Sequence, residues 1–449
     1  MQSINRIALL GALIGLIAFH WPFVILHPNR VMPMGEPYDL LKLPSYYGYV
    51  AAGGWISLAI SSFLPISTLK KLFIAISVTT AVVMTCLALG LGTAHLAEGN
   101  EYARLRIGSG AWITLLASYV AIFAVYDESR RLSLIPLLAT VLVLVIIPLK
   151  HLGIMQEYIT VADVFRGEFI RHMQLVMATL PITICLGIPL GVFAARKPNM
   201  ENSILGVASF LQTIPSVALF GLLLPVLSFY GRHTTVGFAL LLIAVFVILS
   251  LLIVYLLKRY KSRLANLLSI LFILSGILIL LPFVGQFIYQ LIVTNGRVLS
   301  QTTWATPLAE LGVRGLGSAP AIVALTLYGL LPLIANTHTG IKGVATGIVE
   351  AARGMGMSPI QVFYRVELPM AMPFIIQGIR GTLLLLIGLA AVAVLVNAGG
   401  LGYFLMRGME QSVLDLVLLG ALPIVLLALG SDILTRLLGW AIIPKGLRP

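Results

Sequence analysis

Residues 350–369 read EAARGMGMSPIQVFYRVELP, a polar stretch in a chain that is otherwise mostly apolar. Its first four residues are good helix formers, and the two glycines that follow break the helix and leave the backbone open to close approach. Ser358, Pro359 and Gln361 restart a helix, because serine suits the N-cap, proline the first helical position and glutamine a capping box. The stretch therefore predicts a stiff helix–turn–helix outside the bilayer.

The composition of the chain places this stretch between membrane helices. The chain has 449 residues, of which 59% are hydrophobic and 10% are charged, whereas soluble domains carry about 25% charged residues. A chain this apolar is predicted to be a polytopic membrane protein. Its net charge of +13 is better explained by basic loops on the cytoplasmic side of a membrane than by a nucleic-acid partner.

Apolar runs long enough to cross a bilayer, about 20 residues each, recur along the chain. The candidates are residues 7–26, 49–66, 72–94, 108–126, 132–149, 173–195, 204–229, 235–257, 264–283, 319–335, 374–396 and 412–438. The first run is interpreted as a membrane helix, because no small-residue cleavage site of a signal peptide follows it. The predicted fold class is all-α, a polytopic membrane helical bundle of about 12 transmembrane helices.

Basic residues indicate which connections face the cytoplasm. With the N-terminus inside, the predicted inner loops hold Lys70, Lys71, Arg130, Arg131, Arg196, Lys197, Lys258, Arg259, Lys261, Arg263, Lys342, Arg353 and Arg365. Acidic residues are more frequent in the predicted outer loops. Both termini and residues 350–369 are therefore predicted to be cytoplasmic, and this placement uses no motif.

The spacing within residues 350–369 resembles the cytoplasmic loop with which permeases of ABC importers dock on their ATPase subunit. The Glu-Ala-Ala start, the following glycine and the closing Leu-Pro match that family. The resemblance implies a transport subunit and not an enzyme, with ATP hydrolysis on a separate chain. It assigns ATPase coupling to Glu350, Ala351, Ala352, Gly354, Gly356, Ser358 and Pro369.

Further stretches between residues 173 and 440 resemble the glycine betaine and osmoprotectant branch of these permeases. They are residues 212–219, 319–325, 328–332, 336–341, 378–380 and 397–402. The resemblance implies the type I importer permease fold, alternating access and import of glycine betaine or a related betaine, choline or carnitine. It assigns the translocation pathway to Gln212, Pro215, Ser216, Asn336, Asn397, Gly399 and Gly400.

The predicted organisation has three parts. Residues 1–150 form N-terminal transmembrane helices of unknown role, residues 151–172 an outer interfacial segment, and residues 173–440 the permease domain. Within the permease domain, a helical hairpin at about 230–310 is inserted where the family pattern leads us to expect a short outer loop.

The resemblance also implies the partners of the chain. They are an ABC ATPase subunit, an extracytoplasmic substrate-binding protein, and a second permease copy or a paralogue, in the inner (plasma) membrane. No nucleic acid, cofactor or metal is expected, and no catalytic motif is found.

Two other transport functions stay open. One is an ABC permease for another small solute, such as an amino acid. The other is a secondary transporter driven by an ion gradient, which would need coupling carboxylates near the middle of the membrane. The nearest candidate, Asp432, can instead pair with Arg436 one helical turn later, and Arg380 lies near enough to a helix end to extend to the membrane surface.

Overall fold

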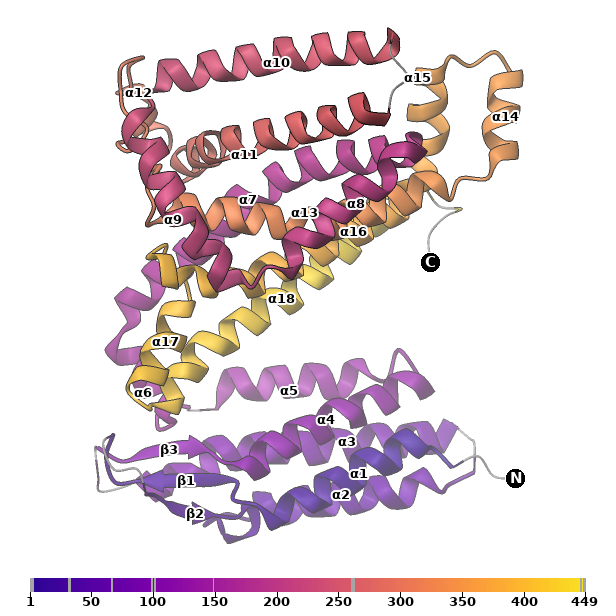
Figure 1. The fold of residues 1–449 in the computed structure, drawn as a ribbon. Coiled ribbons are helices and arrows are strands. Elements are labelled where there is room, and N and C mark those ends of the chain that lie inside the picture. The colour runs from indigo at the N-terminus through magenta and orange to yellow at the C-terminus, as the bar shows by residue number, and fades with distance from the viewer. Residues whose placement is uncertain are drawn as a thin grey trace. The chain divides into compact units, whose positions relative to one another are not determined.

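The computed structural model describes residues 4–30, 34–65, 68–97, 100, 102–147, 149–259, 263–444 and 446. The chain forms two compact units, Met1–Ala162 and Asp163–Pro449 (Figure 1).

Helices long and apolar enough to cross a membrane number seven within the described residues. They are Thr68–Gly92, Ser109–Glu128, Ala162–Arg196, Ser216–His233, Ser318–Lys342, Pro359–Ala390 and Leu414–Ile442. Shorter apolar helices cover Arg6–His20, Leu134–Ile146, Val236–Leu249 and Leu280–Thr294. The predicted polytopic helical bundle is confirmed, whereas the count of about 12 spans stays a prediction.

The first unit is a bundle of helices that pack through small residues. Its helices are α1 (Arg6–Ile17), α2 (Tyr47–Ser62), α3 (Thr68–Leu87) with its π-helical extension η3 (Ala88–Gly92), α4 (Ser109–Glu128), α5 (Leu134–Ile146) and α6 (Gly153–Thr160). A Cβ atom at Gly15 would lie 2.4 Å from Trp55 Cδ2, and one at Gly54 would lie 2.7 Å from the Ala81 nitrogen. Such contacts let helix backbones approach closely, as is typical of helices packed in a membrane.

A small antiparallel sheet in the first unit was not predicted from the sequence. Its order is β2 (Glu36–Tyr38), β1 (Val24–His27) and β3 (Arg104–Ile107), with Val24 opposite both Tyr38 and Ile107. The predicted helix 7–26 ends at Ile17 and continues only as the 3-10 turn η1 (Ala18–His20). Pro22 forces the preceding residue out of the helical region, and Trp21 has φ −116° and ψ 152°.

The second unit is a bundle around one central helix, α13 (Ser318–Lys342). Its other long elements are α7 (Ala162–Arg196), α8 (Pro198–Thr213), α9 (Ser216–His233), α10 (Val236–Arg259), α11 (Arg263–Thr294), α16 (Leu368–Ala390) and α18 (Leu414–Ile442). The short elements α12 (Arg297–Ser300), the 3-10 turn η6 (Val392–Val396) and α17 (Gly402–Glu410) connect them. Helix α13 contacts α8, α9, α11 and α16, and most of its length is buried.

Glycines allow α7 and α16 to approach α13. A Cβ at Gly187 would lie 2.8 Å from Leu333 Cδ2, and one at Gly191 would lie 2.6 Å from Thr337 Cβ. A Cβ at Gly378 of α16 would lie 3.0 Å from Asn336 Cβ of α13. The three helices therefore form the closely packed centre of this unit.

Two predicted segments fall on regular elements. The interfacial segment predicted at 151–172 is α6 and the first turns of α7; its location at the membrane surface stays a prediction. The insertion predicted at about 230–310 covers α10 and α11, which contact each other, and α12; that it is an insertion stays a prediction.

Candidate functional site

The stretch that includes residues 350–369 forms a hairpin of short helices at one end of the second unit (Figure 1). It consists of α14 (Thr346–Gly354), α15 (Pro359–Val362) and the π-helical turn η5 (Phe363–Glu367), which continues into α16. The predicted helix–turn–helix is confirmed. We call residues 346–367 the hairpin loop.

The turn of the hairpin loop is set by a glycine and a capping box. Gly356 has φ +83°, a left-handed conformation that costs other residues free energy. Ser358 Oγ accepts a hydrogen bond from the Gln361 backbone N–H at 3.3 Å, and Gln361 Oε1 accepts one from the Ser358 N–H at 2.8 Å. The predicted capping box is therefore confirmed.

Contacts with α7 fix the base of the hairpin loop. Arg196, at the end of α7, donates from Nη2 to Glu367 Oε2 at 2.6 Å. Its guanidinium carbon also lies 4.6 Å from the centre of the Phe363 ring, a cation–π distance. Arg196 is separated from both partners by more than 160 residues, so no local sequence pattern indicates this role.

A second ion pair ties the ends of α8 and α13 together beside the hairpin loop. Lys342 Nζ donates to both carboxylate oxygens of Glu201 at 2.7 Å, and His338 Nε2 lies 3.1 Å from Glu201 Oε1. The pKa of Glu201 is lowered below its ordinary value, chiefly because the hydrogen bond from Lys342 stabilises the charged carboxylate.

The hairpin loop exposes three large apolar side chains, which together we call its apolar face. The side chains of Met355, Ile360 and Tyr364 are 71%, 70% and 63% exposed, while Ala352 and Val362 are buried inside the loop. Large apolar side chains exposed on a short loop are typical of an interaction surface. The family resemblance does not assign a role to these three residues, although apolar side chains in a loop expected outside the bilayer are a signal of contact with a partner.

The predicted coupling residues divide by exposure. Glu350, Ala351, Gly354, Gly356 and Ser358 are exposed on the hairpin loop, whereas Ala352 is 2% exposed and belongs to its interior. Pro369 is half-buried in the first turn of α16.

The predicted pathway residues start at a break between α8 and α9. Hydropathy predicted a single helix at 204–229, but Pro215 pushes Ile214 into an extended conformation with ψ 124°. Gln212 Nε2 donates to the Tyr328 carbonyl at 2.7 Å, and the Tyr328 hydroxyl donates to the Ile214 carbonyl. Two hydrogen bonds therefore hold the break against α13, with Ser216 beginning α9.

The turn before α17 contains three more predicted pathway residues. Asn397, Gly399 and Gly400 have φ +59°, +76° and +98°. Glu168 Oε2 of α7 accepts a hydrogen bond from the Gly400 N–H at 2.6 Å, and a Cβ at Gly399 would lie 2.7 Å from the same oxygen. The glycines therefore allow this turn to lie directly on α7.

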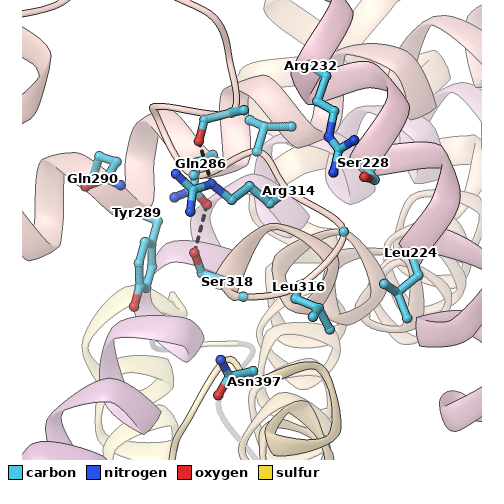
Figure 2. Close-up of a pocket in the computed structure, with 15 residues that line it drawn as sticks. Leu224, Ser228, Arg232, Gln286, Tyr289, Gln290, Arg314, Leu316, Ser318 and Asn397 are labelled. Atoms are coloured by element: carbon cyan, nitrogen blue, oxygen red, sulfur yellow. Dashed lines mark hydrogen bonds between the residues drawn. The ribbon is translucent and has the colours of Figure 1, made fainter.

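The structure does not gather the pathway residues in one place. Gln212, Pro215 and Ser216 lie at the α8–α9 break, Asn336 Nδ2 donates to the Pro332 carbonyl within α13 at 2.8 Å, and the rest lie in the turn before α17. Asn397 lines a cavity of about 880 Å³ whose other walls are α9, α11 and residues 309–318 (Figure 2).

The carboxylate of Asp432 is paired twice. Arg436 Nε lies 2.9 Å from Asp432 Oδ2, which confirms the predicted i,i+4 pair. Arg380 Nε donates to the other oxygen, so Arg380 binds a side chain of α18. A carboxylate held by two guanidinium groups is poorly suited to bind and release a coupling ion.

Comparison with known proteins identifies the family. Residues 187–442 match the family described as "Binding-protein-dependent transport system inner membrane component". The chain belongs to this family. Residues 5–156 match a second family, "ABC transporter permease YehY, N-terminal domain". The chain is thus a multi-pass inner-membrane transport subunit.

Several proteins similar to this chain are named as permeases of transport systems. The osmoprotectant import permease protein OsmW of Salmonella typhimurium is 30% identical over 278 residues, covering 62% of this chain and 91% of the relative. The carnitine transport permease protein OpuCB of Listeria monocytogenes is 26% identical over 278 residues, covering 62% and 88%. The glycine betaine/carnitine/choline transport system permease protein OpuCB of Bacillus subtilis is 32% identical over 196 residues, covering 42% and 90%. The predicted family and branch are confirmed.

Proposed function

We propose that this chain is the membrane subunit of an ATP-driven importer for osmoprotectants such as glycine betaine, carnitine or choline. The observation that carries the proposal is the hairpin loop, a rigid exposed element with an apolar face on a chain of this family. The names of its relatives supply the solute class.

The hairpin loop is the proposed docking site of a separate ATPase chain. The exposed side chains of Met355, Ile360 and Tyr364 fit an apolar groove on a partner, and Gly354 and Gly356 allow its backbone to come close. In this account Glu350 and Ala351 also face the partner, while Ala352, Ser358 and Pro369 hold the shape of the loop.

The hairpin loop is connected directly to two membrane helices, so a movement of the docked loop would be transmitted to them. The loop continues into α16 without a break, and the ion pair between Arg196 and Glu367 ties it to α7. Both helices pack on α13 through glycines, and α7 also carries Glu168, which holds the turn before α17. A rocking motion of these helices would expose the pathway alternately to the two sides of the membrane.

The other partners and the orientation follow from the same proposal. An extracytoplasmic binding protein delivers the solute, and a second permease copy or a paralogue completes the pathway. Both termini and the hairpin loop face the cytoplasm. The double pairing of Asp432 favours ATP over an ion gradient as the source of energy.

A charge placed on the apolar face tests the docking site. Met355→Glu should reduce the affinity for the co-expressed ATPase by roughly tenfold or more, because docking would bury an unpaired carboxylate and each 1.4 kcal/mol is a factor of ten. Met34→Glu is the matched control, since Met34 is 86% exposed in the first unit. Copurification on a tagged permease measures the effect, and equal ATPase recovery with both variants would contradict the proposal.

A further inference from the structure

A cavity with a mixed polar and apolar lining lies at the end of α13 remote from the hairpin loop. Its walls are the last turns of α9, the C-terminal half of α11, residues 309–318 and Asn397. It touches the start of α13 at Ser318, whereas the hairpin loop follows the other end of this 25-residue helix, about 37 Å away at 1.5 Å per residue. The cavity is therefore distinct from the docking site.

The segment 309–318 forms one wall of the cavity and is fixed by contacts with α9 and α11. Its start is bonded to α9, because the Ala309 N–H donates to the Gly231 carbonyl at 2.9 Å. Gly312 has φ +94°, and a Cβ there would lie 2.5 Å from Gln286 Nε2 of α11. A Cβ at Gly315 would likewise lie 2.4 Å from the Leu224 carbonyl oxygen of α9. The segment is fitted to both helices along its length.

The charged side chains among the described lining residues are both arginines. Arg232 comes from α9 and Arg314 from the segment 309–318, and Figure 2 shows Arg314 beside Gln286 and Arg232 beside Ser228. Among the described residues, the lining contains no aspartate or glutamate; Glu310 is a close neighbour in sequence but is not part of it. The two guanidinium groups, whose side chains are both exposed, give this part of the lining a positive charge.

Both arginines have guanidinium N–H groups that are available to donate hydrogen bonds to a ligand. Arg314 Nε donates to the Ala309 carbonyl at 2.8 Å, which orients the guanidinium group and leaves its terminal nitrogens for another acceptor. Among the described residues, Arg232 has no hydrogen bond or ion pair. Ser318 Oγ donates to Gln286 Oε1 at 2.9 Å, which fixes the neighbouring wall.

We propose that this arginine cavity binds the carboxylate group of the transported solute, an inference that rests on the proposed import of osmoprotectants. Guanidinium groups bind carboxylates through paired, charge-assisted hydrogen bonds. Of the lining residues that the structure describes, Tyr289 is the one aromatic side chain, and a single ring does not form the aromatic cage that recognises a quaternary ammonium group. The solutes it selects are therefore carboxylated zwitterions such as glycine betaine or carnitine, and not choline, which carries a hydroxyl group instead.

Binding to the purified full-length chain tests the cavity without the need for transport. Glycine betaine should raise the thermal midpoint of the wild type in a saturable way, because a ligand that binds the folded state stabilises it. The double variant Arg232→Gln/Arg314→Gln should need at least roughly tenfold more betaine for the same rise, which corresponds to 1.4 kcal/mol. Choline at the same ionic strength should give no comparable rise.

Arg297→Gln is the matched control, because Arg297 is exposed on α12 and does not line the cavity. It should respond to betaine like the wild type. An equal response of the double variant, or an equal rise with choline, would overturn the proposal.

Uptake by the assembled importer separates this proposal from the function on which it rests. If the double variant raises the half-saturating concentration for betaine, and not for choline, both stand. The wild-type complex could show no ATP-dependent uptake of any of these solutes while betaine still raises the thermal midpoint of the purified chain. The proposed transport function would then be wrong, whereas the proposal that the cavity binds a carboxylate would be supported. If betaine uptake is normal and unchanged in the double variant, the cavity proposal fails alone.

Discussion

Gly356 shows how a single residue can fix the shape of the hairpin loop. Its φ of +83° costs an alanine about 1–2 kcal/mol, although a Cβ there would meet no atom within 4 Å. Gly356→Ala should therefore distort the turn and reduce ATPase copurification without forming a clash inside the chain.

Gly354→Ala is the informative companion variant. Gly354 ends α14 without a left-handed φ, and its Cβ position is also open, so alanine should leave the loop fold intact. Loss of ATPase binding in this variant with an unchanged melting temperature would indicate close approach of the partner. Normal ATPase binding by Gly356→Ala would contradict the need for this turn.

Glu201 makes a pH-dependent contribution to stability. Its pKa in the folded state is lowered, chiefly by the hydrogen bond from Lys342, and His338 faces the same carboxylate. A lowered folded pKa means that the stabilisation is complete above the ordinary value of 4.5 and is lost as the pH falls through the folded pKa.

Glu201→Gln should therefore lower the melting temperature at neutral pH, and the difference from the wild type should vanish in strong acid. Melting curves of the purified chain from about pH 7 down to about pH 3 measure this. Glu310→Gln is the control, because Glu310 is exposed and outside these contacts. A difference that persists unchanged at the lowest pH would contradict the role of the Glu201 carboxylate.

Residue-scale prediction from the sequence succeeds where the partners are close in the chain. The capping box of Ser358 and Gln361 spans three residues and was predicted correctly. The bonds from Arg196 to Glu367 and from Gln212 to Tyr328 join residues more than 100 positions apart. Such pairs depend on how the helices pack, which the local pattern does not contain.

At the scale of elements, the contact between α7 and α13 depends on small side chains. Gly191→Leu would place atoms where Thr337 and the Ile334 carbonyl lie, and such overpacking typically costs about 1–3 kcal/mol. The melting temperature should fall clearly, whereas Gly206→Leu on α8, where no atom lies within 4 Å, should leave it nearly unchanged. Equal melting temperatures for the two variants would contradict the close packing of α7 on α13.

Hydropathy predicted where most helices lie, but it did not predict two places where an expected helix is interrupted. The apolar residues 23–26 read like the end of a helix, yet β1 begins at Val24 because Pro22 ends the helical path and because the nearby strand β2 and the distant strand β3 supply its partners. The run 204–229 is divided at Pro215 for the same local reason. Hydropathy reports burial in lipid or protein and is insensitive to backbone conformation.

At the scale of the molecule, the two proposed sites lie at opposite ends of one helix. The hairpin loop follows the C-terminal end of α13, and the arginine cavity lies at its N-terminal end. The sequence predicted the family, the helical class and the helix–turn–helix of the hairpin loop, because each has a local pattern. It did not predict the cavity, whose arginines are 82 positions apart (232 and 314) and are brought together only by the packing of α9 and the segment 309–318.

The most direct test of the account is uptake of radiolabelled glycine betaine into vesicles that contain the chain, its ATPase and its binding protein. The account predicts accumulation that requires ATP, persists in Met34→Glu and falls roughly tenfold or more in Met355→Glu, in proportion to lost ATPase docking. Uptake that proceeds without ATP, or that is equal in the two variants, would contradict the claim that the hairpin loop couples ATP hydrolysis to osmoprotectant import.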